Sequence, residues 1–164
     1  MRKLIITVFL FVSSMISNSN ADGHAIKMGI ILGFTGPIES LTPAMAASAE
    51  LAFKEASDSG SLLGGKYISV TRADSTCVDS AAAVTAAEGL VSGGTVAIMG
   101  ADCSGVTGAI AEKVAVPNGV VMISPSATSP GLTDINDRGY FFRTAPSDAR
   151  GGQILADITK DRGV

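Results

Sequence analysis

Apolar and polar residues along this chain form blocks that predict alternating strands and helices. Residues 26–32 (IKMGIIL) are an apolar run without regular alternation, which is typical of a strand buried on both faces of a parallel sheet. Thr42 followed by Pro43 indicates a helix start, because Thr can cap a helix and Pro suits its first position. The same patterns predict strands at 26–32, 67–73, 96–99 and 120–123, and helices at 42–57, 79–91 and 104–116.

Four strands alternating with three helices indicate an α/β fold. Right-handed crossovers then give an open parallel sheet with helices on both faces. Residues 140–144 (YFFRT) predict a short extended segment, and a last helix is expected from about Ala149 to Arg162. The residues expected to cap the helices that they begin are Thr42, Asp79, Ser104 and Asp148.

The first 21 residues have the layout of a secretory signal peptide. Arg2 and Lys3 are followed by an apolar stretch at 4–16, and small residues precede a cleavage position after Ala21. The apolar stretch is too short for a membrane span, which needs about 20 residues. We therefore expect a signal peptide that is cleaved after Ala21 and a mature protein that is exported.

The charge and the cysteines restrict the possible partners. Loss of Arg2 and Lys3 with the signal peptide changes the net charge from −3 to −5. The sequence has no run of basic residues, which argues against nucleic acid or an anionic membrane surface as a partner. Cys77 and Cys103 are the only cysteines, and an even pair in an exported chain favours a disulfide. A zinc site on this pair lacks further ligands, because His24 is the only histidine.

The common enzyme motifs are missing from the sequence. The first loop reads GFTGP rather than G-x-G-x-x-G, and there is no P-loop and no G-x-S-x-G elbow. With His24 as the sole histidine, a Ser-His-acid triad has no base. Asp74, Asp79 and Asp102 match no metal-binding loop and are expected to act as caps and loop residues. We expect a protein that is not an enzyme and has neither cofactor nor metal.

The candidate chemistry lies in the loops that follow the strands, because ligands of open parallel sheets bind beyond the carboxyl ends of the strands. Four such loops, at 33–41, 74–78, 100–104 and 124–133, consist mostly of Gly, Ser, Thr and Pro. Helix starts after these loops favour a small carboxylate. On spacing alone, an alternative fits equally well, in which Ser104 only caps its helix and residues 124–129 form an ordinary turn.

Two segments carry a resemblance to a known family. Residues 123–133 (ISPSATSPGLT) and 137–146 (DRGYFFRTAP) closely resemble the periplasmic leucine/isoleucine/valine-binding proteins. So do Gly36-Pro37, Cys77 and Cys103-Ser104, and the Cys77–Cys103 pair matches a family disulfide. The resemblance implies a two-lobed type I periplasmic binding fold that closes on its ligand and delivers it to an ABC importer.

The same resemblance implies roles for single residues. Ser104 would bind the α-carboxylate of an amino acid through its hydroxyl and N–H groups. Ser126, Ala127 and Thr128 would hold the same head group, with the carbonyl of Ser126 accepting from the α-ammonium. Leu41 would help to line the pocket for the ligand side chain.

The resemblance also divides the chain and suggests its function. It implies a signal peptide at 1–21, a partial first lobe at 22–139, and a crossover with the start of a second lobe at 140–164. Family members are more than twice as long, which indicates a truncation, and without a second lobe we expect weak or no ligand binding. The implied protein is a monomeric solute-binding component of an ABC importer for a branched-chain or similar neutral amino acid. Its partner would be a membrane permease. Binding of amides, urea or other small solutes, and a ligand-sensing ectodomain, are alternatives.

Overall fold

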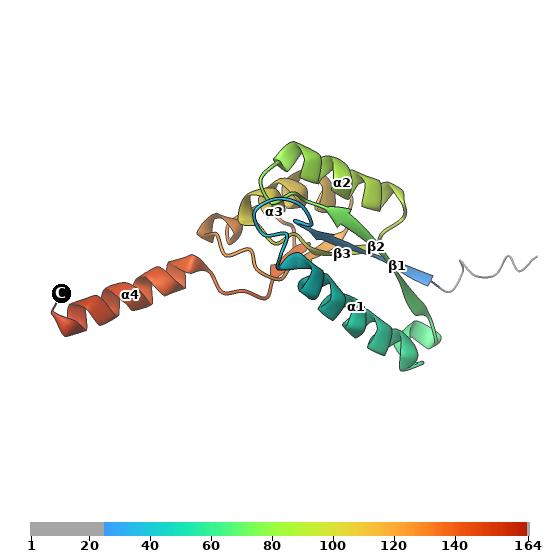
Figure 1. The fold of residues 1–164 in the computed structure, drawn as a ribbon, viewed down its shortest axis with the longest axis horizontal. Coiled ribbons are helices and arrows are strands. Elements are labelled where there is room, and N and C mark those ends of the chain that lie inside the picture. Colours follow the sequence, from blue (N-terminus) through green and yellow to red (C-terminus); the bar gives the residue numbers. More distant parts are fainter. Residues whose placement is uncertain (1–24, 164) are drawn as a thin grey trace, which may run out of the picture.

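The computed structural model of the chain describes residues 25–163, in which strands and helices alternate (Figure 1). The strands are β1 (Ala25–Leu32), β2 (Tyr67–Asp74), β3 (Ala97–Gly100), β4 (Val121–Ser124) and β5 (Phe141–Arg143). The helices are α1 (Thr42–Asp58), α2 (Ser80–Ser92), α3 (Ser104–Ile110, continued by a π-helical turn at Ala111–Ala115) and α4 (Asp148–Arg162). The expected signal peptide and its cleavage position after Ala21 lie outside the described residues.

The strands form one parallel sheet in the order β2-β1-β3-β4-β5. The chain adds β2 on one side of β1 and then crosses to add β3, β4 and β5 on the other side. This arrangement confirms the predicted α/β fold class. Strand β5 goes beyond the prediction of an extended segment, because it pairs with β4 and places Phe142 opposite Ile123.

Helices cover both faces of the sheet, as predicted. Helix α1 packs on one face (Figure 1), where Ile30 and Leu32 form a small core with Ala46. Helices α2 and α3 pack on the other face, and Ile31 belongs to the larger core there. Neighbouring residues of β1 therefore point into different cores, and Ile30, Ile31 and Leu32 are each 0% exposed. This double burial explains the apolar run in the sequence.

Helix α1 leaves part of its face of the sheet open. An apolar groove of about 520 Å³ lies between Met45 and Phe53 on the helix and Met99 and Ile123 on the strands. Ile123 is 43% exposed in this groove. The sheet of the described chain is therefore less completely covered on this face than on the face of α2 and α3.

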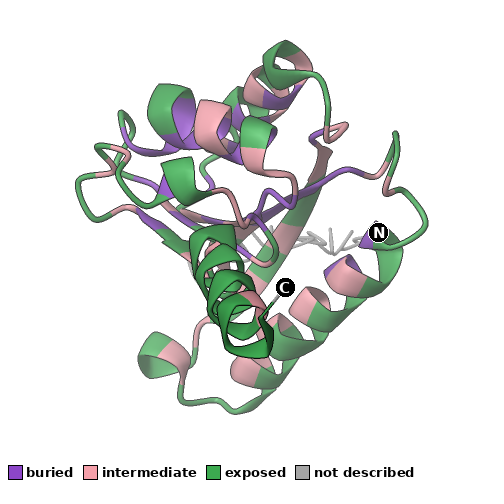
Figure 2. Cartoon of the chain, turned by 90° about the vertical axis from the view of Figure 1, so that its left-hand side faces the viewer, coloured by how far each residue is buried: buried purple, intermediate pink, exposed green. Residues whose placement is uncertain are grey.

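Helix α4 extends away from the sheet and is exposed along most of its length (Figures 1 and 2). Ile154, Leu155 and Ile158 are among its exposed apolar side chains. Within residues 25–163, no helix has both the length and the apolar character needed to cross a membrane.

The helix starts differ in part from the prediction. Asp79 caps α2 as expected, since its carboxylate accepts from two backbone N–H groups of the first turn. Thr42 does not cap α1, because its buried hydroxyl instead donates to the carbonyl of Gly33 at 3.1 Å. Asp148 is the first residue of α4, and the cap is Ser147. A tertiary contact to Gly33 thus engages the hydroxyl of Thr42, and the hydroxyl of the neighbouring Ser147 takes the cap position expected for Asp148.

Candidate functional site

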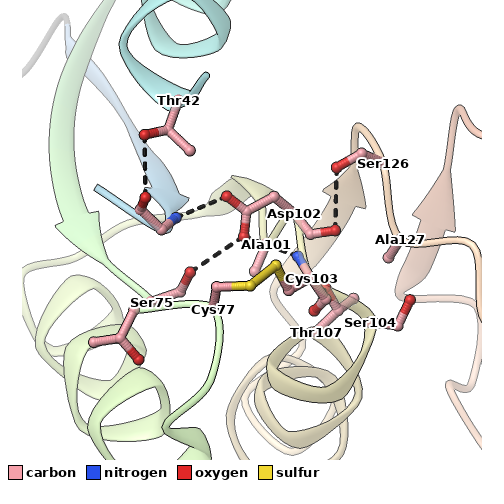
Figure 3. Close-up of a disulfide and its surroundings, with 12 residues drawn as sticks. Thr42, Ser75, Cys77, Ala101, Asp102, Cys103, Ser104, Thr107, Ser126 and Ala127 are labelled. Carbon is pink, nitrogen blue, oxygen red and sulfur yellow. Dashed lines mark hydrogen bonds between the residues drawn. A yellow bond between two sulfur atoms is a disulfide. The ribbon is translucent and has the colours of Figure 1, made fainter. Parts of the chain in front are cut away.

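The loops that follow β1, β2, β3 and β4 lie at the carboxyl edge of the sheet, as predicted. We call this edge, with its four loops, the ligand edge. The strand order reverses between β1 and β3, and open α/β sheets bind ligands in the crevice beside such a reversal. A disulfide between Cys77 and Cys103 ties the loops after β2 and β3 together, with 5.2 Å between the two Cα atoms (Figure 3). The predicted disulfide is confirmed.

Ser104 directs its hydroxyl to the loop after β4 rather than to its own helix. Its Oγ accepts from the backbone N–H groups of Thr128 and Ser129, each at 3.1 Å. Cys103 occupies the N-cap position of α3 and makes no side-chain cap bond, so the prediction of Ser104 as a cap is wrong. A hydroxyl has two acceptor lone pairs and one proton. Because both lone pairs are engaged, the proton of Ser104 remains to donate to another group.

Hydrogen bonds fix the loop after β4. Ala127 is 0% exposed, its methyl group packs in the larger core, and its N–H donates to the Ser124 hydroxyl at 3.0 Å. Ser126 donates from its hydroxyl to the carbonyl of Asp102 at 3.1 Å. No part of Ala127 is therefore open to a ligand in this structure, because the residue is fully buried and its N–H is already bonded.

Arg143 on β5 holds the same loop from the other side. Its guanidinium donates to the carbonyl oxygens of Ala127 at 3.3 Å and Ser129 at 2.7 Å. These carbonyl groups flank Thr128. A further bond reaches the Thr133 hydroxyl at 2.7 Å. The sequence patterns predicted no role for Arg143. An arginine within the short apolar segment YFFRT could have indicated one, because its rigid fork of donors suits neighbouring carbonyl groups.

Among the candidate contact groups, the carbonyl oxygen of Ser126 and the hydroxyl of Thr128 have no hydrogen-bond partner within residues 25–163. Together with the Ser104 proton, they offer an acceptor and donors on neighbouring loops. Leu41 lies on the loop after β1, at the N-cap position of α1, and is 60% exposed. No described contact joins Leu41 to Ser104 or Thr128, so its role at the site stays a prediction.

Asp74 joins the loops after β1 and β2. Its carboxylate accepts from the Thr35 hydroxyl at 2.6 Å and from the Thr76 N–H at 2.8 Å. Burial alone would raise the pKa of Asp74, but these bonds, with those from the Thr35 and Phe34 N–H groups, outweigh burial and hold the pKa below its ordinary value. Residues 25–163 contain no group of three His, Cys, Asp or Glu residues that could hold a metal ion.

Residues 44–164 match the family described as the receptor family ligand binding region, which covers more than half of the chain. The chain belongs to this family. Its relatives include the leucine-specific-binding protein of Salmonella typhimurium, 30% identical over 158 residues, which are 95% of this chain and 41% of that protein. The Leu/Ile/Val-binding protein homolog 3 of Brucella melitensis is 30% identical over 134 residues, 80% of this chain and 35% of that protein. The resemblance to leucine/isoleucine/valine-binding proteins is confirmed, and the chain spans less than half the length of these relatives.

Solved structures of the family share the fold. The branched-chain amino acid binding protein LivJ of Streptococcus pneumoniae, in complex with isoleucine, superposes with a TM-score of 0.67 at 32% identity, over 76% of this chain and 34% of LivJ. A substrate-binding protein of Desulfitobacterium hafniense in complex with Leu has a TM-score of 0.70 at 28% identity. The match covers 85% of this chain and 39% of that protein. A solute-binding protein of R. palustris in complex with benzoate has a TM-score of 0.71 at 26% identity. The match covers 85% of this chain and 38% of that protein. Structures of this family thus include complexes with amino acids and with an aromatic acid.

Proposed function

We propose that this chain supplies the head-group-binding half of a periplasmic solute-binding protein that serves an ABC importer. Its ligand is a branched-chain or similar neutral amino acid, and its protein partner is a permease in the inner membrane. In this role the protein binds and delivers its ligand without catalysis. The observation that carries the proposal is the Ser104 hydroxyl, whose lone pairs are both engaged and whose proton is left for a ligand acceptor.

A zwitterionic head group suits the groups that the ligand edge offers. The Ser104 proton and the Thr128 hydroxyl are donors for an α-carboxylate. The Ser126 carbonyl, which has no partner within residues 25–163, is an acceptor for an α-ammonium. Hydrogen bonds to charged groups are stronger than neutral ones, so correct pairing of both ends contributes affinity as well as orientation. Leu41 completes the proposed contacts, whereas Ala127, which is fully buried with its N–H and carbonyl groups bonded, supports the loop that presents Ser126 and Thr128.

The proposal assigns residues 22–139 to a first lobe and 140–164 to a crossover and the start of a second lobe. Two observations support this division. The relatives are more than twice as long as the part that this chain matches. Helix α4 exposes Ile154, Leu155 and Ile158, an apolar set that suits packing against further protein. The signal-peptide pattern at 1–21 supports export to the periplasm.

A thermal-shift screen of the complete gene product tests the proposal. Leucine, isoleucine and valine should each raise the melting midpoint, because a ligand at 100 times its dissociation constant stabilises the folded state by about 2.7 kcal/mol. Amides and urea serve as the comparison set. Stabilisation by amides or urea, with no response to any amino acid, would refute the proposal.

A second candidate ligand is an aromatic carboxylate. The benzoate complex of the R. palustris relative favours it, since the Ser104 proton can serve any carboxylate. Benzoate has no ammonium group, however, and would leave the Ser126 carbonyl unmatched. Including benzoate in the same screen decides between the two: a larger shift with benzoate than with leucine would favour the aromatic ligand.

A further inference from the structure

Asp102 carries a buried carboxylate that takes no part in the proposed ligand contacts. The residue follows β3 and is 3% exposed. Its carboxylate accepts from the Gly33 N–H at 2.7 Å and from the Cys103 N–H at 2.8 Å (Figure 3). The hydroxyl of the fully buried Ser75 lies at 3.4 Å and is a third donor. The carboxylate is therefore surrounded by donors from separate segments of the chain.

The backbone of Asp102 adds a fourth connection. Its carbonyl accepts from the Ser126 hydroxyl at 3.1 Å (Figure 3). Gly33 follows β1, Ser75 follows β2 and Cys103 belongs to the loop of Asp102 itself. Since Ser126 lies in the loop after β4, one residue contacts all four loops of the ligand edge.

The burial of Asp102 makes these bonds consequential. A buried carboxylate is unfavourable unless hydrogen bonds or opposite charges compensate for its loss of hydration. No ion pair of residues 25–163 includes Asp102, so its compensation comes from the donors on the loops. Movement of the loop after β1 or β2 away from Asp102 weakens this compensation, while the loop after β4 is joined to the same residue through its carbonyl. The four loops are consequently coupled through a single side chain and its carbonyl.

We propose that Asp102 is a positioning residue for the ligand edge. It sets the separation of the loops after β1, β2 and β4, and thereby places Ser126 and Thr128 relative to Ser104. The inference rests on the proposed function, because that function assigns ligand binding to the loops that Asp102 positions. Asp102 itself is not a ligand contact in this proposal.

Asp74 provides a matched control. It is also a strand-end aspartate whose carboxylate accepts from groups of the first and second loops. Unlike Asp102, it has no described bond to the loops after β3 or β4. Asp102→Asn and Asp74→Asn therefore change the same kind of side chain at the same edge, but only Asp102 is connected to all four loops.

The test combines hydrogen exchange without ligand and leucine titration of the complete gene product. Asparagine keeps the shape of aspartate but places an NH₂ donor against one of the N–H donors. In Asp102→Asn we expect faster exchange at Gly33 and Cys103 and also at residues 126–129, with a loss of leucine affinity of about tenfold. In Asp74→Asn we expect faster exchange at Thr35 and Thr76 only, with a loss of affinity below about threefold.

Each outcome decides the proposal. A folded Asp102→Asn variant whose exchange at residues 126–129 equals that of the wild type would show a purely local role and overturn it. If that variant does not fold, Ser126→Ala provides the test, because it removes only the hydrogen bond between the Ser126 hydroxyl and the Asp102 carbonyl. Faster exchange at residues 127–129 in Ser126→Ala supports the proposal, and unchanged exchange refutes it. Failure of the wild type to bind leucine counts against the proposed function alone, since the exchange is read without ligand.

Discussion

The hydroxyl oxygen of Ser104 lies 3.1 Å from the backbone nitrogen of Thr128, which joins the start of α3 to the loop after β4. The N–H of Ser129 occupies the second acceptor position of the same oxygen. Ser104 therefore presents only a proton to the ligand edge. The disulfide at the neighbouring Cys103 restrains the position from which it does so.

Ser104→Ala should weaken both binding and folding. The change removes the ligand donor and leaves two backbone N–H groups without their acceptor. We expect leucine affinity to fall about tenfold or more, and the free energy of unfolding to fall by about 1–2 kcal/mol. Isothermal titration and urea unfolding of the complete gene product measure these effects. Ser104→Thr keeps the hydroxyl and should retain most of the affinity; equal affinities of the wild type and the alanine variant would remove Ser104 from the site.

Thr128→Ala should weaken binding while leaving stability nearly unchanged. Its hydroxyl has no partner within residues 25–163, so its loss breaks no bond of the unliganded fold. The expected loss of leucine affinity is about tenfold to a hundredfold, because one hydrogen bond to a charged group contributes about 1.5–3 kcal/mol. Thr128→Ser is the matched control and should bind like the wild type. A melting midpoint that falls with the affinity would indicate a structural role instead.

Arg143→Lys tests whether the guanidinium fork holds the loop after β4. Lysine keeps the charge but cannot donate to the Ala127 and Ser129 carbonyl groups in the same geometry. We expect faster hydrogen exchange at residues 126–133 and a free energy of unfolding lower by about 1–2 kcal/mol. Exchange rates in this loop equal to those of the wild type would mean that the loop keeps its conformation without the guanidinium of Arg143.

Local patterns predicted much of the fold because they report burial and helix starts. The apolar run at 26–32 indicated a strand buried on both faces, and Ile30 and Ile31 indeed belong to different cores. Asp79 caps its helix through bonds only two and three residues away, which a local pattern can show. Strand β5 lies within the extended segment predicted at 140–144, but three residues could not show that the segment pairs with β4.

The site depended on contacts between distant segments, which spacing does not show. Ser104 bonds to residues 24 and 25 positions away rather than to its own helix. The carboxylate of Asp102 receives the Gly33 N–H across 69 positions. A serine or aspartate at a helix start has the same local signature whether it caps the helix or holds another loop, so the pattern predicted caps at both kinds of position.

Reduction of the disulfide should lower stability without abolishing the sheet. Cys77 and Cys103 are separated by 26 positions, and closing a loop of this size stabilises the fold by about 3 kcal/mol on the chain-entropy model. The double variant Cys77→Ala/Cys103→Ala should therefore unfold at lower urea concentration, with far-ultraviolet circular dichroism close to that of the wild type. Mass spectrometry of the native, oxidised protein should find no free thiol. Two free thiols there would contradict the disulfide.

Asp74 should make the stability of the protein depend on pH under acidic conditions. Its pKa is lower in the folded protein than in the unfolded chain, where an aspartate has a pKa of about 3.9. The ionised carboxylate therefore stabilises the fold at pH values above about 3.9, and this contribution is lost as the pH falls through the folded-state pKa. The free-energy difference between the wild type and Asp74→Asn should be largest near neutral pH and should shrink in acid.

Thr35→Ala distinguishes this effect from a general response to acid. The Thr35 hydroxyl donates to the Asp74 carboxylate at 2.6 Å and is one of the groups that lower its pKa. Its removal should move the acid loss of the Asp74 contribution to higher pH, because the carboxylate then ionises less readily. Urea unfolding of the three proteins across the acidic range measures the difference. A gap between the wild type and Asp74→Asn that is the same in acid and at neutral pH would show that the hydrogen bonds of Asp74 do not couple its ionisation to folding.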